Sequence, residues 1–318
     1  MPGTAPWEHA AVGLLRLAGL IDSSVSKACI VKKVSGESLL DELLWRSACV
    51  LGMAAMLSAC IAVAGGRSLS VVGPAGGSMT VSIAGPGGNA LGASPTVVLQ
   101  SGLGDSRAPW ARVAREVAIR HQVFSYDRPG YGGSDSVAGA RDPCSVAAEL
   151  HELLKRAGIR PPYLLVGHSL GGLYHHAFAR MYPQEVSGVL LLDPTHPDHI
   201  ASLKIDAPAR AAAAQGMHLI LFGAAATREF DDQALCRERL VGPPQRPVPT
   251  RVLVSTRRGP LEEGAFADML ERMRTDWLHL TGAPRLERVA DSGHYLQVDQ
   301  PEVVAAAIKA MADRATSP

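Results

Sequence analysis

A single pentapeptide, Gly167-His168-Ser169-Leu170-Gly171, restricts the architectures open to this chain more than any other feature. It directly follows the apolar run Tyr163–Val166, which predicts a buried strand, and it opens a helical pattern over Leu170–Tyr182. So sharp a passage from strand to helix forces the serine into a strained backbone conformation and leaves no room for side chains at the two glycines. The helix N-terminus adds a partial positive charge beside the serine. The pattern therefore predicts a hydroxyl presented on a tight turn for nucleophilic chemistry.

From Arg67 onward, short apolar runs alternate with helical patterns, after an initial hairpin of two strands. This alternation is typical of an α/β fold with a mostly parallel sheet of about eight strands and helices on both faces. The expected strands are Ser68–Val72, Met79–Ala84, Thr96–Gln100, Gln122–Tyr126, Tyr163–Val166, Val189–Leu192, Arg251–Ser255 and Leu286–Val289. The expected helices are Trp110–Arg120, Ser145–Ala157, Leu170–Tyr182, one through Leu261–Leu280 and a final one from Glu302.

The N-terminal part of the chain has a different character. After a mixed segment, residues 1–46, the run Ser47–Gly66 contains no charged residue. Twenty helical residues span about 30 Å, the thickness of a bilayer core, so we expect a transmembrane anchor, with a buried core helix as the alternative. Lysines and arginines precede the run more often than they follow it, which places residues 67–318 on the extracytoplasmic side.

Two processing signals offer an alternative to an uncleaved anchor. Ala62-Val63-Ala64 is similar to a signal-peptidase site, and Cys60 ends a stretch similar to a bacterial lipobox. Either would give an exported or lipid-anchored protein. Because such a leader would be about sixty residues, against the usual 15–30, we favour the uncleaved anchor.

Charge and cysteine content exclude some classes of function. The chain carries 31 basic and 30 acidic residues, so no long-range field favours nucleic acid. The five cysteines show no metal-binding spacing. Cys144 and Cys236 could pair if their domain is exported, but two separate free thiols are the preferred expectation.

A serine hydroxyl needs a base to take its proton. Of the eleven histidines, His294 alone lies in a late turn, after the last expected strand and before the last helix, that could return it to Ser169. His168 is expected to be structural, and His175 and His176 to be packed or solvated. His196 and His199 flank Asp198 in a proline-containing loop, and we assign them no metal.

With these residues in place, the chain from about Ser68 to its end resembles the α/β-hydrolase superfamily, in particular its membrane-anchored or exported actinobacterial-type branch. The resemblance rests on five motifs in the family's order. They are Ser101–Asp105, Tyr126–Gly132, Val166–Gly172, Leu192–Asp198 and Gly293-His294.

The resemblance implies an oxyanion hole made by the backbone N–H groups of Leu103 and Leu170. Gln100-Ser101-Gly102 replaces the His-Gly often present before Leu103, which backbone donors tolerate. Arg128 is expected to order loops near the site.

The family's catalytic acid is harder to place. Most members carry it after the seventh strand, where Val254–Gly259 has no carboxylate. Asp193, at the end of the sixth strand, is the expected substitute, because some members place the acid there and it could orient His294. A plain turn-capping role for Asp193 is the alternative. Asp198 is the second candidate and Glu262 the third.

These residues together predict a serine hydrolase that cleaves a carboxylic ester, or a related acyl bond, through an acyl-enzyme, with no metal, nucleotide or flavin. A dehalogenase or epoxide hydrolase of this family would carry Asp in place of Ser169, and a dienelactone-type enzyme would carry Cys. Three alternatives stay open: a peptidase, a haloperoxidase-like activity on the same residues, and a ligand-binding receptor with little turnover.

The expected partner is a small acyl substrate. The insertion after the sixth strand, about residues 195–249, is expected to form a cap over it. Within this insertion Ala207–Ala214 and Leu219–Phe222 would line or cover the acyl pocket.

Overall fold

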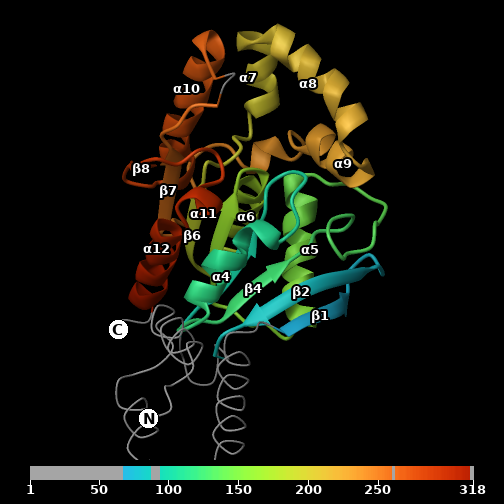
Figure 1. Ribbon diagram of the computed structural model, residues 1–318, viewed down its shortest axis with the longest axis vertical. Helices are drawn as coiled ribbons and strands as arrows, with labels where there is room; N and C mark the ends of the chain where they lie inside the picture. The colour runs from blue at the N-terminus through green and yellow to red at the C-terminus, as the bar shows by residue number, and fades with distance from the viewer. Residues whose placement is uncertain (1–66, 87–93, 260–261, 316–318) are drawn as a thin grey trace, which may run out of the picture. The chain divides into compact units, whose positions relative to one another are not determined.

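The structure is a computed structural model that describes residues 67–86, 94–259 and 262–315 (Figure 1). The described residues all belong to the unit Ile61–Pro318. The expected anchor Ser47–Gly66, the segment before it and the two processing signals lie outside the described residues. None of the helices within the described ranges is both long and apolar enough to cross a bilayer.

Eight strands form one sheet in the order β1-β2-β4-β3-β5-β6-β7-β8 within the described residues. β2 pairs antiparallel with both β1 and β4, and all neighbouring pairs among β3 to β8 are parallel, which confirms the expected mostly parallel sheet. The strands are β1 (Arg67–Val72), β2 (Ser78–Ala84), β3 (Thr96–Gln100), β4 (Val123–Tyr126), β5 (Tyr163–His168), β6 (Val186–Leu192), β7 (Thr250–Ser255) and β8 (Leu286–Val289).

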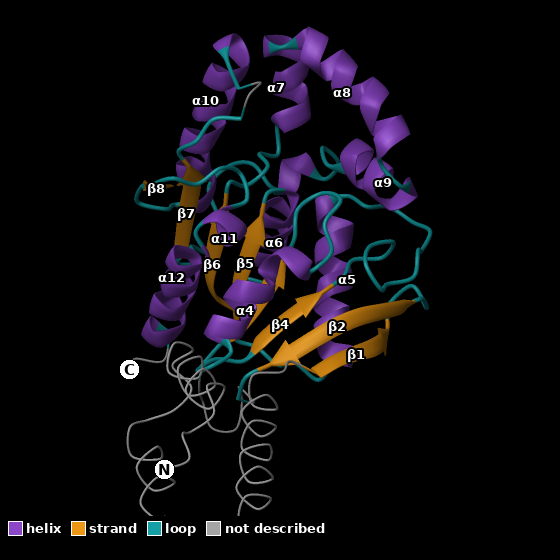
Figure 2. Ribbon diagram, in the orientation of Figure 1, coloured by secondary structure: helices purple, strands orange, loops and turns teal. Residues whose placement is uncertain are grey.

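Helices cover both faces of the sheet (Figure 2). The helical segments are η1 (Ala108–Trp110), α4 (Ala111–Val117), α5 (Pro143–Arg156), α6 (Leu170–Met181), α7 (His199–Asp206), α8 (Pro208–Leu221), α9 (Ala224–Asp232), η2 (Arg237–Arg239), α10 (Gly264–Thr281), α11 (Leu296–Asp299) and α12 (Pro301–Arg314). The expected helices from Ser145 and from Glu302 correspond to α5 and α12. The helix expected through Leu261–Leu280 begins later, at Gly264.

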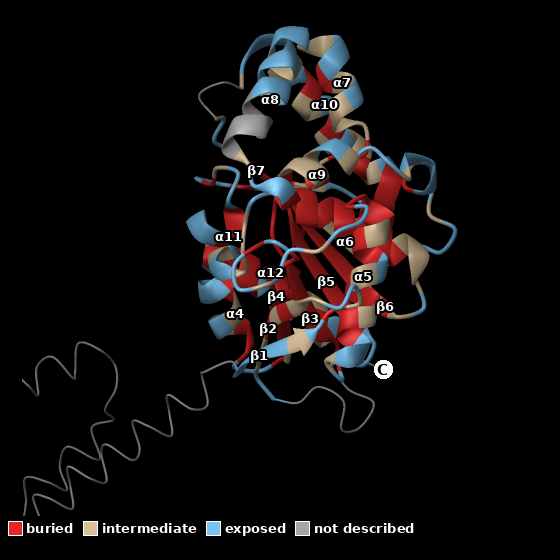
Figure 3. Ribbon diagram, turned by 90° about the vertical axis from the view of Figure 1, so that its right-hand side faces the viewer, coloured by how far each residue is buried: buried red, intermediate tan, exposed pale blue. Residues whose placement is uncertain are grey.

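Alternating side chains of the central strands enter two separate cores, because successive residues of a strand point to opposite faces. Val98 and Leu165 pack with α5, α6 and α10 on one face, and Leu99 and Val166 pack with α4, α11 and α12 on the other. The strands are buried on both sides, as Figure 3 shows by their colour. This explains the continuous apolar runs in the sequence.

The insertion between β6 and β7, which was expected to form a cap, contains α7, α8, α9 and η2, and its helices lie beyond one end of the sheet (Figures 1 and 2). We call residues 195–249 the cap. Ala207–Ala214 was expected to line or cover the acyl pocket, and the lining is wrong, since these residues do not line the cavity that contains Ser169. Half of the residues in this stretch are exposed and half are partly buried, and Ala207 and Ala211 pack on Met269 and Met273. The side chains of residues 217–221 are outside the described ones, and Phe222 packs near Tyr131.

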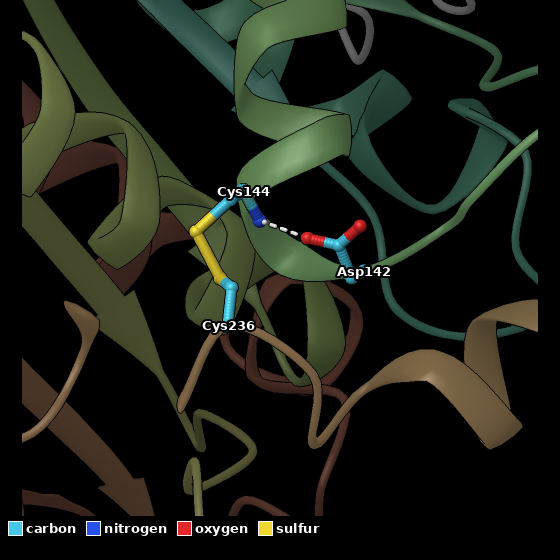
Figure 4. Close-up of side chains that lie close together, drawn as sticks. All are labelled: Asp142, Cys144 and Cys236. Carbon is cyan, nitrogen blue, oxygen red and sulfur yellow. Dashed lines mark hydrogen bonds between the residues drawn. A yellow bond between two sulfur atoms is a disulfide. The ribbon is translucent and has the colours of Figure 1, made fainter. Parts of the chain in front are cut away.

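A disulfide joins the cap to the core. Cys144, in the first turn of α5, is bonded to Cys236, which directly precedes η2 (Figure 4). The preference for two free thiols is therefore wrong. The pairing could not be inferred from a local sequence pattern, because the two cysteines are 92 residues apart along the chain. The Asp142 carboxylate accepts hydrogen bonds from the Cys144 and Ser145 N–H groups and so caps the helix that carries the bond.

Because the disulfide closes a long loop, its removal should lower stability substantially. We expect the double variant Cys144→Ala/Cys236→Ala to lose about 2–5 kcal/mol in free energy of unfolding. Urea unfolding with and without dithiothreitol measures this. Dithiothreitol should destabilise the wild type and leave the variant unchanged. Equal stability of the two oxidised proteins would contradict the expectation.

Candidate active site

Ser169 occupies the turn between β5 and α6, with backbone angles of φ 53° and ψ −122°. This is a strained conformation for a residue with a side chain, as expected from the sequence. Neither flanking position has room for a side chain. A Cβ on Gly167 would lie 2.4 Å from the Gly171 carbonyl oxygen, and a Cβ on Gly171 would lie 2.4 Å from the Gln100 carbonyl oxygen. Local packing therefore fixes the position of the serine.

The Ser169 side chain faces a cavity of about 280 Å³ that His294 and Asp193 also line. Its Oγ lies 3.4 Å from Thr195 Oγ1. Within the described part of the chain, no hydrogen bond joins this hydroxyl to His294. The structure thus brings Ser169 and His294 to one cavity, with the hydroxyl turned toward Thr195.

His294 lies in the loop between β8 and α11, and its side chain is about half exposed. His168 holds this loop in place, since its Nε2 donates to the His294 carbonyl oxygen at 2.9 Å and the two rings lie 4.6 Å apart. Burial lowers the pKa of His168 to about 3, so this ring is neutral. His168 therefore serves the structure of the site, as the sequence suggested.

Asp193 follows β6 directly and has a positive φ of 40°. Its Oδ2 lies 3.5 Å from His294 Nδ1. Its Oδ1 accepts from the backbone N–H of Ser255 at 3.2 Å and from Arg274 at 3.3 Å. One oxygen is thus fixed by the protein and the other faces the imidazole. Burial alone would raise the pKa of Asp193, but His294 and the charge of Arg274 outweigh it and hold the pKa below its ordinary value.

The two other candidate acids lie in different surroundings. Asp198 forms an ion pair with Arg237 in the cap. Glu262 lines the same cavity as Ser169, but Asp193 is the carboxylate that, among the described residues, lies 3.5 Å from His294 Nδ1. The geometry therefore favours Asp193 as the partner of the imidazole.

The two expected oxyanion donors flank the serine. Leu170 is the first residue of α6, and Leu103 lies in the loop after β3. This loop approaches Ser169 closely, because a Cβ on Gly102 would lie 3.2 Å from Ser169 Cβ. Among the residues that the structure describes, no oxygen accepts a hydrogen bond from either N–H. Both donors are available to a developing negative charge.

Several cavity residues could not be identified from the sequence. The helix α10 supplies Phe266, Leu270 and Met273, which recur at helical spacing and form an apolar wall. The same helix supplies Arg274, which also donates to Ser255 Oγ at 3.0 Å. The helical apolar pattern was the available signal, but nothing local indicates which face of α10 meets Ser169.

Among the described residues, no group of side chains that includes a histidine lies close enough together to share a metal ion. His196 contacts Asp276 at 2.9 Å and lines the cavity with His199, whose pKa burial lowers to about 4. In the described ranges, the one group of side chains close enough to share a metal ion is Asp142, Cys144 and Cys236. The two sulfur atoms of that group are already joined in the disulfide (Figure 4).

Three buried histidines predict sensitivity to acid. Burial lowers the pKa of His168 and His175 to about 3, and of His176 to about 4, from the ordinary 6.5. Below pH 6.5 these histidines bind protons in the unfolded chain but not in the folded protein. The free energy of unfolding is therefore highest above this pH, as far as these groups are concerned, and decreases as the pH falls. We expect the free energy of unfolding to decrease toward pH 4 by up to about 1.4 kcal/mol per pH unit for each histidine.

Urea unfolding across this pH range measures the effect. The variant His175→Leu serves as its control, since both ring nitrogens of His175 lack a hydrogen-bond partner in the described structure. The slope of its stability against pH should be smaller by up to about 1.4 kcal/mol per pH unit, the contribution of one histidine. An unchanged slope would show that His175 does not resist protonation.

Residues 95–217 match a family model described as alpha/beta hydrolase fold. The chain is 34% identical over 99 residues to the uncharacterized protein YqjL of Bacillus subtilis (strain 168), which covers 31% of this chain and 39% of that protein. It is 40% identical over 95 residues to the putative carbamate hydrolase RutD of Escherichia coli O103:H2 (strain 12009 / EHEC), which covers 30% of this chain and 35% of that protein. The chain thus spans little more than a third of the length of these curated relatives.

A solved structure extends the likeness over most of the chain. The crystal structure of a membrane phospholipase A, described as a novel bacterial virulence factor, aligns with a TM-score of 0.59 and 21% identity. The alignment covers 87% of this chain and 97% of that chain. At this level of identity, the likeness shows a common fold.

Proposed function

We propose that this chain, whose residues 95–217 match the alpha/beta hydrolase fold family model, is a serine hydrolase that cleaves carboxylic esters through an acyl-enzyme. The observation that carries the proposal is the convergence of Ser169, His294 and Asp193 at the carboxyl ends of their strands, around one cavity. Ligands of open α/β sheets bind at these strand ends.

In the proposed mechanism, His294 is the general base. Its Nδ1 faces Asp193, so the opposite ring nitrogen, Nε2, is left to take the serine proton. In this mechanism the Ser169 hydroxyl turns from Thr195 toward this nitrogen by rotation about its Cα–Cβ bond. Catalytic hydrogen bonds of this kind are often long without substrate and shorten when it binds.

The deprotonated oxygen attacks the ester carbonyl and forms a tetrahedral intermediate. The N–H groups of Leu103 and Leu170 stabilise its oxyanion. His294 then returns the proton to the leaving alcohol, and water, activated by the same imidazole, hydrolyses the acyl-enzyme. Asp193 holds the imidazole in the tautomer with a proton on Nδ1 and stabilises its charged form.

The cavity supports a short acyl chain as the preferred substrate. Its volume of about 280 Å³ lies just below the range of ligand pockets, which measure roughly 300–1,000 Å³. The apolar wall of Phe266, Leu270 and Met273 fits a hydrocarbon chain rather than a charged group.

We expect the rate of hydrolysis of p-nitrophenyl esters to fall as the acyl chain outgrows the cavity. The variant Leu270→Ala removes part of the wall and should move the preference toward longer chains, by roughly tenfold in the ratio of kcat/KM values. Ile205→Ala, on the exposed surface of the cap, is the matched control. A wild type that hydrolyses no ester of the series would contradict the proposed function. An unchanged preference in Leu270→Ala would contradict the assignment of the wall alone.

We also propose that the hydrolase domain lies outside the cytoplasm, attached to the membrane through Ser47–Gly66. The disulfide between Cys144 and Cys236 supports this location, because such bonds persist in oxidising compartments. Intact cells should lose the domain to added protease, and alkaline carbonate should leave the protein in the membrane pellet. Protection from protease together with free thiols would contradict this location, and release by carbonate would contradict the anchor.

A further inference from the structure

A buried ionic network connects the cap to the loop that carries Leu103. Its central residue is Glu229, on the cap helix α9, whose carboxylate is completely buried. Glu229 forms two hydrogen bonds with Arg128, at 2.8 and 2.9 Å, and one with Arg141 at 3.3 Å. Both arginines are 2% exposed. A paired, bidentate geometry of this kind is required to retain charges in the interior.

Arg128 also forms hydrogen bonds with the backbone beside the proposed nucleophile. Its two terminal nitrogens donate to the carbonyl oxygens of Ser101 at 2.6 Å and Gly102 at 2.7 Å. The Gly102 carbonyl and the Leu103 N–H belong to the same planar peptide group and point in opposite directions. Fixing the Gly102 oxygen therefore fixes the direction of the Leu103 N–H, the proposed oxyanion donor.

A second path runs from Glu229 to the same loop. The Tyr131 hydroxyl donates to Glu229 at 2.9 Å and lies 3.4 Å from the N–H of Gly104. Burial opposes the charge of Arg128, but Glu229 outweighs it and raises the pKa of the guanidinium, which stays a permanent donor. Both paths start on the cap and end on the residues that flank Leu103.

The part of the cap that carries Glu229 is itself held to the core at the start of α5. The Arg141 N–H donates to Asp232 at 2.7 Å, and the Cys144–Cys236 disulfide lies a few residues further along both segments. Three kinds of contact thus hold α9 in one position against α5. Glu229 is therefore a rigid support for Arg128.

We propose that Glu229 is a positioning residue for catalysis, by which the cap sets the orientation of the oxyanion hole through Arg128 and the Gly102–Leu103 peptide. This proposal rests on the proposed ester hydrolysis. Glu229 does not touch the substrate. It acts on the transition state alone, because the oxyanion forms only after attack on the carbonyl.

The test compares Glu229→Gln with Glu149→Gln. Glu149 is the matched control, since it pairs with Arg141 in the same network and does not contact Arg128. The first measurement gives kcat and KM for a short-chain ester, with kcat calculated per active site, and the active sites are counted by complete reaction with a fluorophosphonate. The second measurement gives the inhibition constant of an alkylboronic acid that forms a tetrahedral adduct.

For Glu229→Gln we expect kcat to fall about 10–100-fold, somewhat less than for complete loss of one oxyanion donor. The affinity for the boronic acid should fall in parallel, while KM stays within about twofold. Glu149→Gln should keep kcat within about twofold and lose only stability. A kcat of Glu229→Gln per titrated serine equal to that of the wild type would overturn the proposal.

If Glu229→Gln does not fold, Arg128→Lys decides the question, because lysine keeps the charge opposite Glu229 but cannot donate to both carbonyls. A fall in kcat at constant KM supports the proposal, and an unchanged kcat overturns it. Failure of the proposed function would be distinct, since the wild type itself would then neither hydrolyse esters nor react with the fluorophosphonate.

Discussion

Replacing Ser169 by alanine is expected to lower kcat for ester hydrolysis by about 10⁶-fold, the loss measured when the nucleophile of a serine hydrolase is removed. The variant lacks the oxygen that forms the acyl-enzyme, and no other hydroxyl on the turn can replace it. Alanine introduces no larger group into the crowded turn, so the melting temperature should change little. Steady-state hydrolysis of a short-chain ester, with a thermal unfolding curve for each protein, gives the result.

Ser187→Ala is the matched control for this variant. Ser187 lies on β6, and its hydroxyl donates to the Tyr163 carbonyl oxygen, away from the cavity. Its kcat should stay within about twofold of wild type, as is usual for a substitution remote from the chemistry. A Ser169→Ala protein that folds and retains more than a few per cent of the activity would show that another group is the nucleophile.

Asp193→Asn is expected to lower kcat by about 10³–10⁴-fold. The amide has nearly the shape of the carboxylate, but it cannot stabilise the imidazolium, and its NH₂ group would favour the wrong tautomer of His294. The contacts of Oδ1 with the Ser255 N–H and Arg274 bias the amide oxygen toward that side. The NH₂ group would then face His294. Stopped-flow and steady-state rates with the same ester measure the loss.

Asp198→Asn is the control, because Asp198 was a candidate acid and pairs with Arg237 in the cap. It should retain kcat within about twofold. Near-wild-type activity of Asp193→Asn would show that the acid is misassigned while leaving Ser169 in place. Glu262→Gln would then be the next variant, since Glu262 shares the cavity.

The nucleophile turn could be predicted because its determinants are local. The strand over Tyr163–Val166, the helix from Leu170 and the two glycines all lie within twenty residues. The structure gives Ser169 a φ of 53° and leaves less than 2.5 Å for a Cβ at either glycine. Backbone strain and close packing of this kind leave a clear pattern in a sequence.

The surroundings of Asp193 could be predicted only in part. The lack of a carboxylate after β7 indicated the end of β6 as the expected position of the acid, which stays a prediction. The structure adds that Ser255, the last residue of β7, supports Asp193 with its backbone N–H. Every residue except proline has a backbone N–H, so the residue type does not indicate which one donates to Asp193. Arg274 is 81 residues away from Asp193 along the chain. Neither could be inferred from a local pattern.

The link between cap and core was missed for the same reason. Cys144 and Cys236, and likewise Arg128 and Glu229, are brought together by contacts about one hundred residues apart. The order of strands and helices predicts a cap after β6, but not which of its faces meets the sheet. The Ala207–Ala214 stretch has the composition of a buried helix, yet half of its residues are exposed and none is fully buried.

The identity of the residue that reacts is the most direct test of the account. The folded protein, treated with a fluorophosphonate, is digested and its peptides are examined by mass spectrometry. We expect one adduct, on Ser169, that forms at least about 10²-fold more slowly in His294→Ala because the base is lost. An adduct on a different residue, equal rates in the two proteins, or no adduct on a folded wild type would contradict the account.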